Sequence, residues 1–173
     1  MSDHSVWLEQ LLVQLDLCGP QGRAARRELL ERKVKVSIHH QPTAARWTLA
    51  GNIQLNPRYL AGNPEDPYPL SLIVHEVRHL QQGFFTALSV YGELDAWQQQ
   101  FSFIKSLTGR YQLNSKADGM LASLMALNLS WDREMLCRAR MIIKEYAGKY
   151  YRIDLLPLYP LPQETLFFIK GYR

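Results

Sequence analysis

Residues 70–83 read LSLIVHEVRHLQQG, and the position of the two histidines in this stretch decides the fold that we expect. Each residue of an α-helix advances about 100° around the axis, so His79 lies about 40° from His75 and Glu76 lies about 100° from it. The opposite side of the same helix carries four apolar residues, which are Ile73, Val77, Leu80 and Phe84. The stretch therefore predicts a helix over residues 70–82 that buries its apolar side and turns its histidines toward a cleft.

The spacing His-Glu-x-x-His suits the binding of one metal ion. Two imidazoles that lie one helical turn apart can bind a single Zn²⁺, and a carboxylate beside them reaches a water molecule rather than the metal. We therefore expect His75 and His79 to be metal ligands, Zn²⁺ to be the cofactor, and Glu76 to be the general base. The alternative is a surface helix in which His75 and Glu76 form hydrogen bonds only.

A catalytic zinc ion takes a third protein ligand and keeps one coordination position open. Our first choice for this ligand is Glu93, in the segment YGELDAWQQQ (residues 91–100). If the helices over 70–82 and 88–107 form an antiparallel hairpin with Thr86 at its tip, Glu93 lies level with His79. Asp95 points to nearly the opposite side of its helix, so we expect it to contribute little to metal binding.

Other acidic residues and histidines leave alternatives open at this stage. Asp118 and Asp132 are further candidates for the third ligand, in which case Glu93 is a solvated acid near a helix start. His39 and His40 are adjacent in a predicted strand, where neighbouring side chains point to opposite faces. We therefore do not expect these two histidines to share a metal ion.

The rest of the chain indicates an α+β fold, in which an N-terminal helix and a small β-sheet precede several helices. Leucines at helical spacing predict a helix over 5–17, which Gly19, Pro20 and Gly22 are expected to end. A basic, helix-favouring stretch follows over 23–33. Alternation of apolar and polar residues predicts a strand within 34–40. The segment WTLAGNIQLNP (47–57) reads as a strand pair or a bent strand, with a tight turn at Gly51-Asn52.

The second half of the chain is expected to be mainly helical. Helices are predicted over 88–107, 116–129 and 132–148, and Gly109 marks the end of the first of these. The tail over 150–173 is rich in Tyr, Leu and Pro, and we expect it to wrap over the surface, with strands as one possible form. We find no linker or repeat, so we expect one domain over residues 1–173.

The charge and composition of the chain indicate in which compartment the protein resides and which kinds of partner it has. The chain has 173 residues, of which 47% are hydrophobic, and a net charge of +4. No run approaches the roughly 20 apolar residues of a membrane helix, and the N-terminus lacks the features of a signal peptide. Cys18 and Cys137 belong to no paired motif, which favours a reducing compartment. We therefore expect a soluble cytoplasmic protein without a membrane partner.

The HEVRH segment followed by ELDA (residues 93–96) resembles the gluzincin metallopeptidases, especially the minimal single-domain members. The resemblance covers residues 34–107. It implies a zincin-like fold with a zinc-binding helix and a glutamate helix, with His75, His79 and Glu93 as ligands and Glu76 as the base. It also implies that the edge strand of the cleft binds the substrate backbone, and 47–57 is the candidate segment. An ordinary sheet strand is the alternative for that segment.

We therefore expect a zinc-dependent hydrolase that cleaves peptide bonds in a peptide or protein substrate. One alternative is a zinc-binding protein that acts on another amide or has no turnover. The other is a regulatory or nucleic-acid-binding module that uses the basic stretch 23–35, although Glu28 and Glu31 interrupt that stretch. We do not expect nucleic acid to be a partner. The substrate, its cleavage preference and the oligomeric state are not encoded in any motif.

Overall fold

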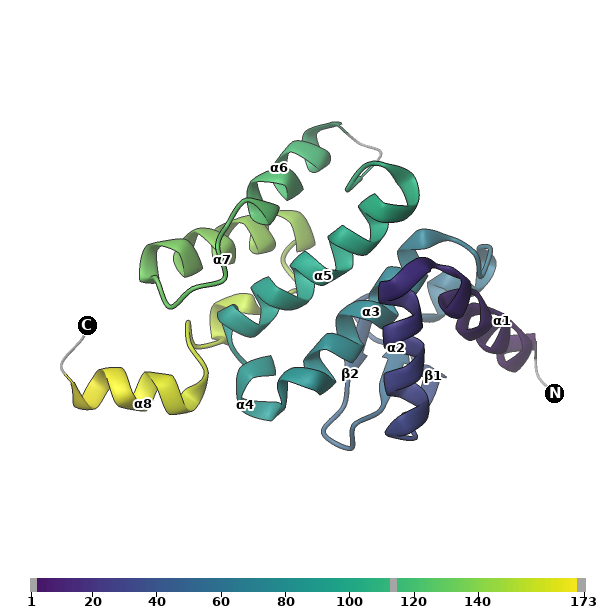
Figure 1. The fold of residues 1–173 in the computed structure, drawn as a ribbon, viewed down its shortest axis with the longest axis horizontal. Helices are drawn as coiled ribbons and strands as arrows, with labels where there is room; N and C mark the ends of the chain where they lie inside the picture. The colour runs from purple at the N-terminus through teal and green to yellow at the C-terminus, as the bar shows by residue number, and fades with distance from the viewer. Residues whose placement is uncertain (1–2, 113–114, 171–173) are drawn as a thin grey trace.

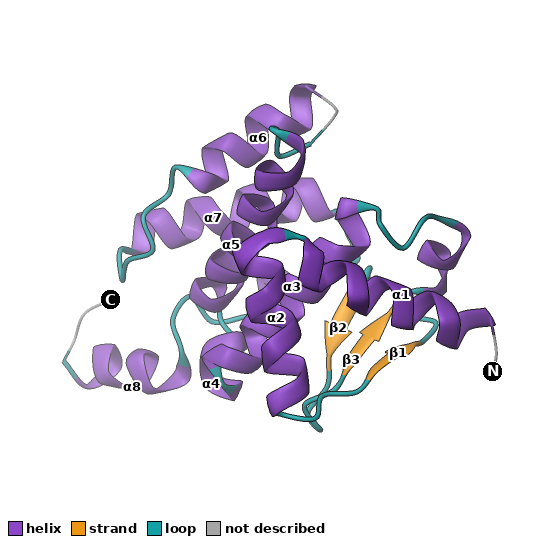
Figure 2. Ribbon diagram, turned by 45° about the vertical axis from the view of Figure 1, so that its right-hand side comes forward, coloured by secondary structure: helices purple, strands orange, loops and turns teal. Residues whose placement is uncertain are grey.

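The protein is mostly helical and carries one small sheet, as a computed structural model describing residues 3–112 and 115–170 shows (Figures 1 and 2). The longer helices are α1 (Asp3–Leu17), α2 (Gly19–Glu31), α3 (Pro67–Gln82), α5 (Val90–Thr108), α6 (Ser115–Met125), α7 (Arg133–Ala147) and α8 (Leu161–Ile169). The shorter ones are η1 (Pro57–Ala61), α4 (Phe84–Ala87) and η2 (Ile153–Leu155). An α+β composition is therefore confirmed.

The sheet has three strands, β1 (Val36–Ile38), β2 (Ala45–Trp47) and β3 (Ile53–Leu55), in the order β1-β3-β2. β3 is parallel to β1 and antiparallel to β2. The predicted strand pair thus exists, but its first strand begins at Ala45, and its second strand is central rather than at the edge. The turn also differs from the prediction. The Gly51 N–H donates to the Thr48 carbonyl at 2.8 Å, so Leu49 and Ala50 occupy its centre.

The predicted break after the first helix is much shorter than expected. α2 begins at Gly19 immediately after α1, with Pro20 in its first turn, where the missing N–H costs no hydrogen bond. Gly22 lies inside α2 and does not end a helix. A Cβ at this position would lie 2.2 Å from the Leu15 carbonyl oxygen, so the glycine permits the close approach of α1 and α2.

Helix α3 begins at a capped turn and is buried along most of its length. The Asp66 carboxylate accepts the Tyr68 N–H at 2.9 Å, and Pro67 occupies the first turn. Ile73 and Val77 lie in a hydrophobic cluster with residues of α1, α2 and the sheet, as predicted for the apolar side. Phe84 does not belong to this side. It is 47% exposed in α4, because α3 ends at Gln82 and the chain turns at Gly83, which has a φ of 76°.

Helix α5 packs along α3 (Figure 1). Residues of α5 also belong to a second hydrophobic cluster. The N-terminus of α5 is capped by the Ser89 hydroxyl, which accepts the Gly92 N–H at 3.0 Å. Leu94, Trp97 and Phe101 of α5 pack there against α6, α7 and η2. The two clusters therefore lie on either side of the α3–α5 pair.

The tail contains helices rather than the strands that we considered. Between residues 150 and 170 the chain forms η2 and α8, with Pro162 in the first turn of α8. Before α8, the carbonyls of Pro157 and Leu158 accept the N–H groups of Val90 and Tyr91 at the start of α5. These two hydrogen bonds hold residues 157 and 158 of the tail against the first turn of α5. The last three residues of the predicted tail, 171–173, lie outside the described residues.

Candidate metal centre

His75 and His79 lie one turn apart on α3, and both imidazoles are buried. Their Nε2 atoms are 3.0 Å apart. Two nitrogens bound to one tetrahedral zinc ion, each about 2.0–2.1 Å from it, lie roughly 3.3 Å apart, so this separation fits a shared ion. Burial holds the pKa of His75 well below its ordinary value, and the neighbouring His79 lowers it further. His75 therefore keeps the neutral form that a metal ligand needs.

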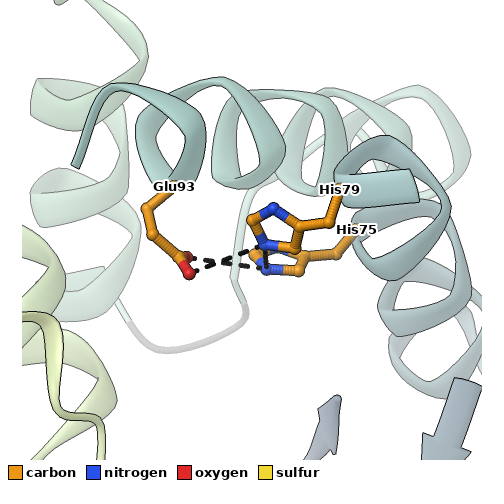
Figure 3. A group of neighbouring side chains, drawn as sticks. All are labelled: His75, His79 and Glu93. Carbon is orange, nitrogen blue, oxygen red and sulfur yellow. Dashed lines mark hydrogen bonds and ion pairs between the residues drawn. The ribbon is translucent and has the colours of Figure 1, made fainter. Parts of the chain in front are cut away.

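Glu93 comes from the first turn of α5 and points toward the two histidines (Figure 3). Its Oε1 lies 3.6 Å from His79 Nε2, and its Oε2 lies 3.8 Å from His75 Nε2. The ligand atoms of the three buried residues all lie within 4.8 Å of one another. Two imidazole nitrogens and one carboxylate oxygen are the donor set of many catalytic zinc sites. The three residues therefore fit a metal ion such as Zn²⁺.

A chain of hydrogen bonds holds His79 from behind. Its Nδ1 lies 3.2 Å from Gln82 Oε1, a contact in which Nδ1 is the donor because an amide oxygen only accepts. The Gln82 amide in turn donates to the Gly92 carbonyl at 2.9 Å and to Asp95 at 2.7 Å. Arg78 closes the chain with a 2.8 Å ion pair to the same Asp95 oxygen. This arrangement leaves the His79 Nε2 lone pair free for a metal ion.

The Glu93 carboxylate has two hydrogen-bond donors of its own. Trp97 Nε1 donates to Oε2 at 3.2 Å, and the Tyr151 hydroxyl donates to the same oxygen. Burial and the adjacent Glu93 raise the pKa of Tyr151 well above its ordinary value, so the hydroxyl keeps its proton. No local pattern in the sequence distinguishes Tyr151 from the other tyrosines of the tail. Tyr151 follows Glu93 by 58 residues, and only the path of the tail brings the two together.

Glu76 lies beside the cluster and is not a member of it. Its side chain is buried, and burial together with the nearby Glu93 raises the pKa of its carboxyl to about 8, although a hydrogen bond from the Trp47 backbone opposes this shift. A divalent cation bound between the three neighbouring side chains would lower this pKa by favouring the carboxylate. The position is the one that we expected for a base that is not a ligand.

The cluster opens into a cleft between β2, α3 and the start of the tail. The cleft has two adjoining hollows of about 250 and 320 Å³, and His75, Glu76 and Tyr151 line both of them. Trp47, His79 and Glu93 line only the second hollow. A small molecule or one or two residues of a peptide fit such a volume, with their polar groups next to Glu76.

The other acidic residues and histidines that we considered are not part of this cluster. Asp118 accepts the backbone N–H groups of Tyr111 and Gln112, and Asp132 caps α7 by accepting the Met135 N–H. His39 and His40 also lie outside the cluster. Within the described part of the chain, His75, His79 and Glu93 form the one group of three or more such residues close enough to share an ion.

The remaining expectations concern the cysteines and the basic stretch. Cys18 and Cys137 are free thiols and do not pair with each other. Within the basic stretch, Arg27 and Arg32 form ion pairs with Glu31 and Glu28. Among residues 3–112 and 115–170, no helix has the length and apolar character needed to cross a membrane.

Comparison with protein-family models, with curated proteins and with solved structures gives no match. The resemblance to gluzincins therefore rests on the HEVRH and ELDA segments and on the cluster that these two segments form. A buried cluster of two histidines and a glutamate that could hold a metal ion is the class of site that the structure defines.

Proposed function

We propose that the protein is a zinc-dependent metallopeptidase of the HExxH type with a zincin-like fold. The observation that carries this proposal is the buried cluster of His75, His79 and Glu93, which opens into a cleft beside Glu76. The three side chains come from two adjacent helices (Figure 3). All three line the cleft, so one side of the cluster is open to it. A catalytic zinc site needs such an open side, whereas a structural site is usually closed by four protein ligands.

We assign a different role in hydrolysis to each residue of the site. His75, His79 and Glu93 would hold the ion, which when bound acts as a Lewis acid toward water and toward a carbonyl oxygen. Glu76 would take a proton from the attacking water and deliver it to the leaving amine. The pKa of the Glu76 carboxyl is about 8 without a cation, and a cation bound beside it would lower this pKa, so that the carboxylate could accept the proton of the water.

The edge of the sheet supports a peptide as the substrate. At the ends of the β2–β3 pair, the Thr48 N–H donates to the Asn52 carbonyl, and the Ala44 carbonyl accepts the Asn56 N–H. The backbone groups of Ala45 and Trp47 therefore point away from β3, since alternate residues of an antiparallel strand face opposite edges. The Trp47 N–H reaches Glu76, which places this edge next to the cleft. An extended peptide could pair with such an edge.

Metal analysis combined with one isosteric substitution tests this function. The protein purified without added zinc should contain about one zinc ion per chain, and it should cleave a denatured protein substrate. Glu76→Gln should keep the zinc and lose about 10²–10⁴-fold in rate, because it removes only the base. A protein that cannot be loaded with zinc would disprove the metal site. Full activity of Glu76→Gln would disprove the role of Glu76.

A further inference from the structure

Three arginines line the cleft on both sides of the candidate metal centre. Arg58, from η1, lines the hollow that lies next to His75 and Glu76. Arg46, from β2, and Arg152, which precedes η2, line the hollow that also contains His79 and Glu93. All three residues are exposed to solvent where they line the cleft.

No carboxylate of the described residues forms an ion pair with any of these three arginines. Arg46 Nε donates to the Gln54 amide oxygen at 2.8 Å, and Arg58 donates to the Tyr59 hydroxyl at 2.7 Å. Both partners are neutral. Other arginines of the chain are paired with acids, among them Arg32 with Glu28 and Arg78 with Asp95. The positive charge of these three arginines is therefore available to a ligand.

The cleft contains few negative charges to offset these arginines. Of the residues that line the two hollows, only Glu76 and Glu93 are acidic. Glu93 belongs to the candidate metal centre, and Glu76 is the candidate base. A bound divalent cation would add further positive charge. The lining of the cleft therefore carries three arginines against two carboxylates, and an excess of one sign of charge concentrates ligands of the other sign.

We propose that the cleft selects acidic polypeptide segments, with Asp or Glu side chains on both sides of the residue that lies next to Glu76. Arg58 would bind acidic groups on one side, and Arg46 and Arg152 would bind them on the other. A polypeptide fits better than a nucleic acid, because the β2 edge presents the Ala45 N–H together with the carbonyls of Ala45 and Trp47, whereas a phosphodiester backbone offers only acceptors. Cleavage of such segments rests on the proposed function, whereas their binding does not.

Binding to a variant without turnover tests this selection. Zinc-loaded Glu76→Gln protein is titrated against a labelled peptide in which Glu and Asp alternate with Ala, and against the same peptide with Gln and Asn in their place. Fluorescence anisotropy should show at least about tenfold tighter binding of the acidic peptide at low salt, and a smaller difference at high salt. Equal binding of the two peptides would overturn the proposal.

Substitution of the arginines assigns the effect to the cleft. Arg46→Gln, Arg58→Gln and Arg152→Gln should each weaken binding of the acidic peptide by about two- to fivefold, and the binding of the amide peptide should stay unchanged. Arg23→Gln on α2 removes the same charge from an exposed position outside the cleft and should have no effect. An equal loss in Arg23→Gln would mean that only the net charge matters, and this would contradict the proposal.

Two further results separate this proposal from the proposed function. If the acidic peptide binds selectively but wild-type protein cleaves no peptide, the selection stands and the peptidase function fails. If wild-type protein cleaves neutral and acidic peptides at equal kcat/KM, the function stands and the selection fails. A single-stranded oligonucleotide that binds the cleft tightly, while the acidic peptide does not, would also overturn the proposal in favour of a nucleic acid.

Discussion

At the scale of single residues, the hydrogen-bond chain behind His79 explains the charged residue inside the HEVRH segment. Arg78 points out of the metal cluster and pairs with Asp95, which is buried on α5. The pair compensates a carboxylate that would otherwise be buried without a counter-charge. Asp95 also fixes the Gln82 amide, whose oxygen accepts the His79 ring N–H. Asp95 is thus not a member of the candidate metal centre, but it positions His79, which is.

The hydrogen bonds from Asp95 through Gln82 to His79 change our expectation that Asp95 contributes little to metal binding. Asp95→Ala and Gln82→Ala should each weaken zinc affinity by about 10–100-fold, because the partners behind a ligating histidine fix its tautomer and orientation. Competition with a chromophoric chelator measures the affinity, and circular dichroism checks the fold. Asp95→Asn keeps an acceptor for Gln82 and should lose less.

A matched truncation separates this effect from general destabilisation. Gln10→Ala on α1 shortens an exposed glutamine outside the cleft and should leave zinc affinity unchanged. Glu93→Ala removes a candidate ligand and one negative charge. It should therefore reduce zinc affinity more than Asp95→Ala or Gln82→Ala does. Unaltered zinc affinity in Asp95→Ala would show that the chain behind His79 has no role in binding.

At the scale of elements, the α3–α4–α5 turn positions Glu93. The predicted hairpin is present, but its connection contains the short helix α4. Gly92 lies directly against this helix, since a Cβ there would lie 2.0 Å from the Thr86 carbonyl oxygen. The Ser89 hydroxyl donates to the same carbonyl at 2.7 Å. The absence of a side chain at Gly92 therefore lets α5 begin close enough to α3 for Glu93 to reach the histidines.

Gly92→Ala should displace the first turn of α5 and destabilise the protein by about 1–3 kcal/mol. The displacement also moves Glu93, so zinc affinity should fall together with stability. Denaturant unfolding and chelator competition measure the two effects. The control is Gly119→Ala on α6, where nothing lies within 4 Å of an added Cβ. This substitution should stabilise the protein by about 0.5–1 kcal/mol, because alanine favours a helix more than glycine does. Equal stability of the two variants would refute the close-approach argument.

At the scale of the whole molecule, the candidate metal centre formed by His75, His79 and Glu93 lies between the two hydrophobic clusters. His75 and His79 belong to α3, whose apolar side packs with α1, α2 and the sheet. Glu93 belongs to α5, which packs with α6, α7 and the tail. Tyr151 adds a bond from the tail to Glu93. An ion held by these residues would therefore link both halves of the molecule.

Zinc should raise the stability of the whole protein by mass action. At a free zinc concentration about one hundred times Kd, the free energy of unfolding should increase by about 2.7 kcal/mol. For a chain of this size, the Tm should rise by roughly 5–10 °C. Calorimetry at several zinc concentrations measures the shift. His79→Ala should abolish its dependence on zinc, and the site would be disproved if the wild-type Tm were insensitive to zinc.

Much of the secondary structure and part of the site follow from local patterns. The 3.6-residue period of 70–83 predicts most of α3 and places His75 and His79 on one side, although the helix begins at Pro67, before the predicted start at Leu70. Short-range geometry also led to Glu93, because a hairpin of two helices brings residues on either side of the turn level with each other. These inferences succeed because they depend on neighbours along the chain.

The amino-acid sequence by itself therefore determined most of α1, α3, α5 and α7, the pair of histidines and the choice of Glu93 as their partner, but not α4 or the helices of the tail. Only the tertiary structure decided that Tyr151 bonds Glu93, that β2 rather than β3 is the edge strand, and that Arg46, Arg58 and Arg152 share one cleft with Glu76. These contacts join residues that are far apart in the chain. Their formation depends on how whole elements pack, and no local period or cap encodes that packing.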